Sequence, residues 1–244
     1  MSQSLAVELI PILDDNYVPV LIDWDHSNAI VVDPGESQAV SAFLKQHQLS
    51  LKAILVTHQH ADHIAGIAEL KKQFSCVVYG PQLHQSQIPD LDRPLMGDET
   101  LQLGSFVFSV LLLPGHTRGH LGYLEQNHHW LFSGDVIFGL GCGRVFDGSL
   151  ETTFESLQKM KELPLSTTIF CAHEYTESNW RFLLSLKTPL SPAQIAYGEN
   201  LKESRSKALP SVPLSLASEI QCNPFLLAGT FEEFRKLREK RNQF

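Results

Sequence analysis

Three histidines and an aspartate fall within six positions of the chain, in the segment Thr57-His58-Gln59-His60-Ala61-Asp62-His63. Imidazole and carboxylate groups are common ligands of zinc and of other divalent transition metals. Residues two apart in an extended backbone point the same way, so His58 and His60 can bind one ion as a pair. Asp62 and His63 follow where the chain turns, so they can face a second ion. A histidine-rich surface loop is the simpler alternative.

Three further candidate ligands occupy places in the chain that are equivalent to the place of His58. His58 follows the apolar run 53–56, and His116, Asp135 and His173 each follow an apolar β-type run in the same way. Strand ends in a layered α/β protein can gather on one edge, where such side chains can meet. Seven donors exceed the roughly four that a tetrahedral ion binds, and they suit two ions about 3.5–4 Å apart.

The donor types favour a pair of divalent metal ions as the cofactor. Zinc is the expected metal, and iron or manganese would accept the same donors. Water bound between two cations can have a pKa of about 7, so the site needs no protein nucleophile. The chain indeed contains no Gly-x-Ser-x-Gly motif. We expect Asp62 and Asp135 to be the catalytic carboxylates, and we assign the ligands as follows: His58, His60 and His116 to the first ion, Asp62, His63 and His173 to the second, and Asp135 as the bridge.

The elements that position these residues alternate between strands and helices. The residue patterns predict a meander of strands at 5–13, 18–23 and 29–32, helices at 37–48 and 64–74, strands at 76–79 and 100–113, and a hairpin at 121–132. We expect residues 86–98 to form a loop. A capping box at Thr152 and Glu155 predicts a helix over 154–162, and a last strand precedes His173.

Beyond residue 173 the pattern becomes helical. A helix is predicted over 174–186, a second begins at Ser191-Pro192, and Thr230 with Glu233 caps a third. We therefore predict two domains, a metal-binding catalytic domain at residues 1–173 and a helical domain at 174–244.

Composition limits the partners and the compartment. A formal charge of −8 argues against a nucleic-acid binder. No apolar run approaches the roughly 18 residues that span a bilayer, and the segment Met1–Glu8 does not have the pattern of a secretory signal. Four widely spaced cysteines fit a reducing compartment. We expect a cytoplasmic monomer that binds neither nucleic acid nor membrane.

The segments around the candidate ligands resemble those of a known family. Residues 57–63 match the Thr-His-x-His-x-Asp-His signature of the metallo-β-lactamase superfamily, and His116, Asp135 and His173 match its later ligands in order. The resemblance is closest to the glyoxalase II, or hydroxyacylglutathione hydrolase, family. It extends through these segments: Asp14–Tyr17, Pro114–His120, Phe132–Asp135, Gly141–Arg144, His173–Thr176 and Asn223–Phe225.

This resemblance implies a fold and a reaction. The fold would be α/β, an αββα sandwich followed by a small all-helical C-terminal domain that helps to bind glutathione. The reaction would be hydrolysis of S-(R)-lactoylglutathione and other S-2-hydroxyacylglutathiones to glutathione and D-lactate, the second step of methylglyoxal detoxification. A metal-held hydroxide would attack the thioester. The thiol of the leaving group has a pKa of about 8.5, so a general acid is less necessary than for an amide.

Glutathione carries carboxylates, so an acidic chain must supply basic side chains locally. Arg238 and Arg241 lie three apart on a predicted helix and share a face, and arginine binds carboxylates with two parallel bonds. The resemblance places the family's basic substrate-binding pair at these positions and adds Arg144, Phe146 and Tyr175. A solvated basic C-terminal helix is the alternative for the arginine pair.

Two positions depart from the family pattern. Phe146 stands where some members have tyrosine, and Leu227 stands where a basic residue is expected. Among the other histidines, we expect His120 to support a ligand or to pack beside it, and we expect the rest to be solvated: His26, His47, His84, His128 and His129.

Two other functions remain open on the sequence alone. One is another dinuclear metal hydrolase of the same fold, acting on an ester or a lactone. The other is a non-catalytic protein that binds glutathione thioesters.

Overall fold

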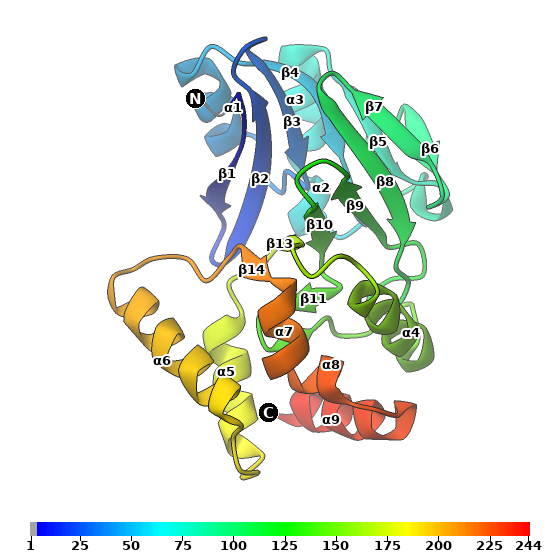
Figure 1. Ribbon diagram of the computed structural model, residues 1–244. Coiled ribbons are helices and arrows are strands. Elements are labelled where there is room, and N and C mark those ends of the chain that lie inside the picture. Colours follow the sequence, from blue (N-terminus) through cyan, green and yellow to red (C-terminus); the bar gives the residue numbers. More distant parts are fainter. Residues whose placement is uncertain (1–3) are drawn as a thin grey trace. The chain divides into compact units, whose positions relative to one another are not determined.

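The structure is a computed structural model that describes residues 4–244, so the first three residues of the N-terminal segment discussed above lie outside it. The chain forms two compact units, drawn in Figure 1. Unit 1 comprises the residues up to Leu112 together with Gly119–Asn127, and unit 2 comprises Leu113–Arg118 and His128–Phe244. No helix in the described range is long and apolar enough to cross a bilayer. The domain boundary near residue 173 stays a prediction.

Unit 1 contains a mixed sheet in the order β1 to β6. The first pairs are antiparallel and the pairs from β3 onward are parallel. The predicted meander is present, but a short strand lies inside the predicted loop at 86–98, where Pro94 on an edge strand hides the pattern. The strands are β1 (Leu5–Ile12), β2 (Asn16–Asp23), β3 (Asn28–Val32), β4 (Ser50–Leu55), β5 (Val77–Pro81) and β6 (Arg93–Leu95).

Helices cover this sheet, as Figure 1 shows for α1 and α3. Their buried residues, such as Leu44 and Leu70, join the sheet residues in one apolar core. Of the predicted helix 64–74, residues 67–74 form α3, and Ile64 is the last residue of the short helix α2. Gly66 lies between the two helices and packs against the chain at Glu36, where a Cβ would lie 2.5 Å from a backbone carbon. Unit 1 includes α1 (Gln38–Gln46), α2 (Ala61–Ile64), α3 (Ile67–Phe74), a 3-10 turn η1 (Gln82–His84), and the antiparallel strands β7 (Thr100–Leu103), β8 (Phe106–Leu112) and β9 (Leu121–Glu125).

Unit 2 combines short strands with the C-terminal helices. Strand β10 (Trp130–Gly134) runs parallel to β13 (Thr168–Cys171), which pairs with β14 (Leu214–Ser215). A small antiparallel hairpin joins β11 (Ile137–Phe138) to β12 (Gly141–Cys142). The helices are α4 (Leu150–Lys161), α5 (Thr176–Ser185), α6 (Pro192–Ser206), α7 (Leu216–Cys222), α8 (Pro224–Leu227) and α9 (Phe231–Gln243).

Two of the three predicted capping boxes are present in the structure. Ser191 with Gln194 and Thr230 with Glu233 form the predicted capping boxes of α6 and α9. The predicted box at Thr152 is wrong by three residues, since Ser149 caps α4 and Thr152 is its reciprocal partner. Serine and threonine are both good N-cap residues, so the residue types alone do not show whether the helix begins after Ser149 or after Thr152.

Aromatic rings join the helices of unit 2. Phe234 of α9 contacts Phe154 of α4 with ring centroids 5.6 Å apart and Phe225 of α8 at 6.1 Å. Phe225 in turn stacks with Phe182 of α5 at 6.1 Å. Such contacts bury large apolar areas and fix the helices relative to one another.

A buried carboxyl group in α7 makes the stability of unit 2 sensitive to pH. Glu219 is fully buried and accepts hydrogen bonds from the Tyr197 hydroxyl at 2.7 Å, the Leu140 amide at 2.9 Å and Asn223 Nδ2 at 3.0 Å. Burial raises the pKa of Glu219 from 4.5 to about 7, although these donors act in the opposite direction.

We expect this group to destabilise the folded protein as the pH rises. An unfolded glutamate ionises near pH 4.5, whereas the folded one resists ionisation until about pH 7. The free energy of unfolding that the protonated Glu219 contributes is therefore fully present below pH 4.5. It is lost as the pH rises through 7, and the loss is roughly 3 kcal/mol at most. Urea unfolding of the wild type and of Glu219→Gln at several pH values measures this loss of unfolding free energy. A stability difference that does not change with pH would contradict the expectation.

Candidate metal centre

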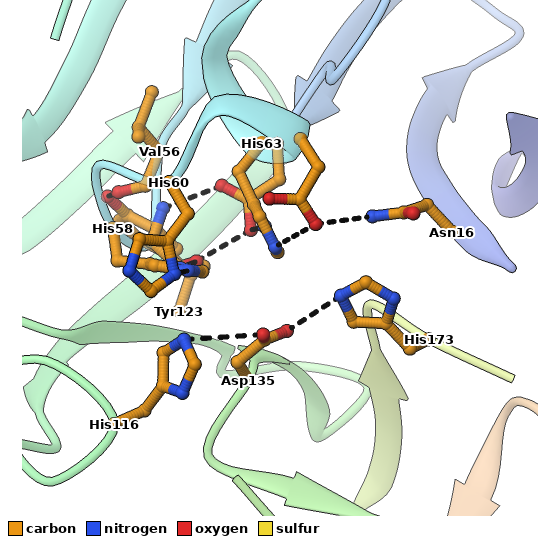
Figure 2. Close-up of polar contacts among 12 residues, drawn as sticks. Asn16, Val56, His58, His60, His63, His116, Tyr123, Asp135 and His173 are labelled. Carbon is orange, nitrogen blue, oxygen red and sulfur yellow. Dashed lines mark hydrogen bonds and ion pairs between the residues drawn. The ribbon is translucent and has the colours of Figure 1, made fainter. Parts of the chain in front are cut away.

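Unit 1 carries four predicted ligands immediately after β4. His58 is fully buried and follows the strand, and His60 lies in extended backbone as the residue before α2. Nε2 of His58 lies 3.0 Å from Nδ1 of His60, so the two rings present nitrogen atoms to the same point (Figure 2). This is the arrangement expected of two residues spaced by one in an extended chain.

Asp62 and His63 present a second pair of donor atoms from α2. Oδ2 of Asp62 lies 3.5 Å from Nε2 of His63. The same oxygen accepts a hydrogen bond from Asn16 Nδ2 at 3.1 Å (Figure 2), so the first residue of β2 fixes the carboxylate. The Asp62 side chain is 38% exposed, whereas His63 is buried.

Asp33 contacts the candidate ligands of unit 1, although the sequence pattern did not predict it. This buried carboxylate directly follows β3 and accepts bonds from the amide and the hydroxyl of Thr57 at 2.7 and 2.6 Å. It also accepts a bond from Nδ1 of His63 at 3.0 Å, which directs the His63 Nε2 lone pair toward Asp62. Atoms of Asp33, His58 and His63 form one of the groups compact enough to hold a metal.

The remaining predicted ligands of unit 2 are organised around Asp135. Oδ2 of Asp135 lies 3.4 Å from Nε2 of His116, and Oδ1 lies 3.4 Å from Nε2 of His173, as Figure 2 shows. Each carboxylate oxygen therefore faces a different imidazole, which suits a bridging ligand. Gly134 takes a φ of 49°, a conformation that favours glycine, and turns the chain at the end of β10 to present Asp135.

The tautomer of His116 follows from its backbone partner. Nδ1 of His116 lies 2.6 Å from the carbonyl oxygen of Arg144, which can only accept a hydrogen bond. The proton must therefore reside on Nδ1, and the lone pair of Nε2 is directed at Asp135. Gly143 permits this close packing, since a Cβ there would lie 2.0 Å from the carbonyl oxygen of Asp135.

Three of the distances between donor atoms fit metal coordination better than hydrogen bonding, whereas the His58–His60 pair, at 3.0 Å, is closer. The pairs His63–Asp62, His116–Asp135 and His173–Asp135 are separated by 3.5, 3.4 and 3.4 Å. Hydrogen bonds between nitrogen and oxygen usually measure about 2.7–3.2 Å. Two atoms that each lie about 2.1 Å from one tetrahedral ion are about 3.4 Å apart. The donor sets of both units therefore fit divalent ions.

Two other histidines are buried in unit 1. His120 is fully buried and stacks on the His58 ring, with centroids 4.8 Å apart, as its predicted supporting role requires. The prediction that His84 is solvated is wrong, because it is 2% exposed and its Nε2 accepts a bond from the Gly119 amide at 3.2 Å. Its position in a short polar 3-10 turn concealed this burial.

Two of the predicted substrate-binding residues, Arg144 and Phe146, are exposed, and a third, Tyr175, is partly buried. Arg144 follows β12, and its guanidinium lies 5.8 Å from the centre of the Phe146 ring. Phe146 is 61% exposed and meets the His116 ring edge to face at 5.1 Å. Tyr175 stacks on His173, with centroids 4.7 Å apart and planes within 6°. Each of these aromatic side chains lies directly against a predicted metal ligand.

Arg238 and Arg241 lie on α9 but have different surroundings. Arg238 is 5% exposed, and its Nη1 donates to the carbonyl oxygen of Cys142 at 2.8 Å. Arg241 is partly buried, and it donates to Asn179 Oδ1 at 3.1 Å and to Ser178 Oγ at 2.9 Å. Burial lowers the pKa of Arg241, and the nearby charge of Arg238 acts in the same direction.

Comparison with known sequences covers the whole chain. The metallo-β-lactamase superfamily model matches residues 16–173, and the model of the hydroxyacylglutathione hydrolase C-terminus matches residues 174–244. A hydroxyacylglutathione hydrolase of Bdellovibrio bacteriovorus is 50% identical over the full length of both chains. One from Vibrio cholerae is 44% identical over 91% of this chain and 86% of its own.

Solved structures agree on the fold. The BLEG-1 B3 metallo-β-lactamase superposes with a TM-score of 0.71 at 26% identity, over 91% of this chain and 99% of its own. ETHE1 from Myxococcus xanthus superposes with a TM-score of 0.72 at 22% identity, over 96% and 90% of the two chains. The metallo-β-lactamase fold with a helical C-terminal region, predicted from the sequence, is confirmed.

Proposed function

Because this chain belongs to the hydroxyacylglutathione hydrolase, or glyoxalase II, family of the metallo-β-lactamase superfamily, we propose that it hydrolyses S-2-hydroxyacylglutathiones. S-(R)-lactoylglutathione is the substrate we expect, and glutathione and D-lactate are the products. The observation that carries this proposal is the match over the full length of the chain, including the C-terminal region, since metal ligands alone do not select a substrate.

Two divalent ions are the cofactor of the proposed reaction. The seven residues assigned from the sequence would hold them, and zinc is the metal that their nitrogen and oxygen donors favour. When bound, the ions supply a water of lowered pKa as the nucleophile and a Lewis acid for the thioester carbonyl.

The protein's own groups keep the ligands in the required protonation state. The carbonyl of Arg144 retains the proton on Nδ1 of His116, and Asp33 does the same for His63. Asn16 orients Asp62 through its hydrogen bond. The two oxygens of Asp135 face different imidazoles, which suits the bridging role assigned to it. No side chain has to protonate the leaving group, because glutathione departs as a thiolate.

We assign the glutathione contacts to the exposed and partly exposed residues of unit 2. Arg144 and Arg241 would attract the carboxylates, and Phe146 and Tyr175 would contact the peptide beside the ligands His116 and His173. Arg238 is buried against Cys142, so we assign it an indirect role. It would hold the backbone at Cys142, two residues before Arg144. Residues 174–244 would form the substrate-binding domain. We also propose that the protein is a cytoplasmic monomer, and its four buried free thiols support a reducing compartment.

A comparison of two thioesters tests the proposal. One is S-lactoylglutathione, and the other is the S-lactoyl thioester of N-acetylcysteamine, which lacks both carboxylates. We expect kcat/KM to be at least about tenfold higher for the glutathione thioester, as the loss of a charged contact would produce. Equal values would leave a thioester hydrolase without glutathione recognition, and no hydrolysis of either compound would overturn the proposal.

Replacing Arg144 by alanine is expected to weaken substrate binding selectively. The side chain is exposed and bears no metal ligand atom, so its loss removes one attraction for a carboxylate. KM for S-lactoylglutathione should rise about fivefold to tenfold, roughly 1 kcal/mol, with kcat little changed. The matched control is the N-acetylcysteamine thioester, whose kcat/KM should not respond. An equal loss for both substrates would place Arg144 outside carboxylate recognition.

A further inference from the structure

The β11–β12 hairpin connects two of the metal-binding residues of unit 2. Asp135 immediately precedes it, and the Gly143 amide closes it by donating to the Val136 carbonyl at 3.1 Å. The carbonyl oxygen of the next residue, Arg144, accepts a hydrogen bond from Nδ1 of His116. The conformation of this hairpin therefore affects both Asp135 and His116.

Side chains from the C-terminal helices bind a backbone group of every residue from Phe138 to Cys142. Asn223 Nδ2 lies 3.2 and 3.0 Å from the carbonyl oxygens of Phe138 and Gly141. The other three bonds are Asn179 Nδ2 to the Gly139 carbonyl at 3.0 Å, the Leu140 amide to Glu219 at 2.9 Å, and Arg238 Nη1 to the Cys142 carbonyl at 2.8 Å.

These four side chains, Asn179, Glu219, Asn223 and Arg238, are together called the hairpin clamp. All four are at most 5% exposed, so their polar groups are committed to these bonds. A two-stranded hairpin of such short strands is marginal on its own. The clamp therefore supplies the interactions that fix residues 138–142.

We propose that the hairpin clamp is a positioning device for the metal centre, through which the C-terminal helices set the geometry of Asp135 and His116. This inference rests on the proposed function, and it gives the helical region a role in metal binding besides substrate recognition. Residues that orient metal ligands from outside the coordination shell affect metal affinity or activity by about 10–100-fold.

Glu219 and Asn223 offer the clearest variants. Glu219→Ala withdraws the acceptor from the Leu140 amide, and Asn223→Ala removes the donors to Phe138 and Gly141. Glu219→Gln keeps an acceptor in place for the Leu140 amide, so it should retain the Zn²⁺ affinity of the wild type. Tyr197→Phe is the matched control, because it removes a bond to Glu219 but touches no residue of the hairpin.

The measurements are the Zn²⁺ dissociation constant by chelator competition, thermal unfolding, and steady-state kinetics on the metal-loaded protein. We expect both alanine variants to weaken Zn²⁺ binding about 10–100-fold and to lower kcat with little change in KM. Glu219→Gln and Tyr197→Phe should bind Zn²⁺ as the wild type does. Hydrogen exchange at the Leu140 amide should be faster than in the wild type in Glu219→Ala, and unchanged in Glu219→Gln and Tyr197→Phe.

The proposal fails if folded Glu219→Ala and Asn223→Ala bind Zn²⁺ like the wild type, or if Tyr197→Phe loses affinity to the same extent. If the alanine variants do not fold, Glu219→Asp provides the same comparison, because its shorter side chain draws the carboxylate away from the Leu140 amide. Zn²⁺ affinity is measured without a thioester, so a failure of the proposed activity is distinguishable from a failure of the clamp.

Discussion

Asp135→Asn is expected to lose at least one metal ion and to reduce thioester hydrolysis by more than about 100-fold, which exceeds the effect usually seen for residues outside the coordination shell. Asparagine has nearly the same shape, but it presents an NH₂ group to one of the two imidazoles that now face carboxylate oxygens at 3.4 Å. It also removes the negative charge that two cations would share. Elemental analysis and kinetics on the same sample measure both effects.

The control for Asp135→Asn removes a negative charge from the same unit without touching a donor. Glu155→Gln on the exposed face of α4 meets this need. It should retain metal and activity. An Asp135→Asn protein that keeps two ions and a wild-type kcat would refute the assignment of Asp135.

Asp33→Ala is expected to affect both stability and metal binding. The change leaves the Thr57 amide, the Thr57 hydroxyl and the His63 Nδ1 proton without the acceptor that now lies 2.6–3.0 Å away. Each buried donor that loses its partner costs about 1–3 kcal/mol, so the free energy of unfolding should fall by at least about 3 kcal/mol. Loss of the carboxylate behind His63 should weaken Zn²⁺ binding about 10–100-fold.

Thr57→Ser is the matched control. It keeps the hydroxyl that donates to Asp33 at 2.6 Å and lies 3.0 Å from Nδ1 of His58, so stability and Zn²⁺ affinity should both stay close to wild type. Urea unfolding and chelator competition give the two quantities. Equal Zn²⁺ affinity in Asp33→Ala and the wild type would show that His63 needs no such partner.

The sequence singled out the candidate ligands through a positional rule. His58, His116, Asp135 and His173 each follow an apolar β-type run, and in unit 2 both His116 and His173 lie 3.4 Å from an oxygen of Asp135. The same rule would have found Asp33, which directly follows β3. The sequence Asp33-Pro34-Gly35 is instead typical of a turn, and a single carboxylate carries no spacing signal of its own.

The hairpin clamp could not be predicted in this way. Asn223 lies 82 positions after Gly141, and Glu219 lies 79 positions after Leu140. No local periodicity links a side chain to a distant backbone carbonyl, since such bonds depend on tertiary packing. The burial of Arg238 was concealed for the same reason, because a basic helix face looks solvated in the sequence.

Metal stoichiometry with activity on one preparation tests the central claim most directly. Purified protein is analysed for zinc, iron and manganese, assayed with S-lactoylglutathione, stripped with a chelator and then reloaded with Zn²⁺. We expect two ions per chain, loss of hydrolysis on stripping and recovery on reloading. Full hydrolysis by protein that contains almost no transition metal would contradict the account.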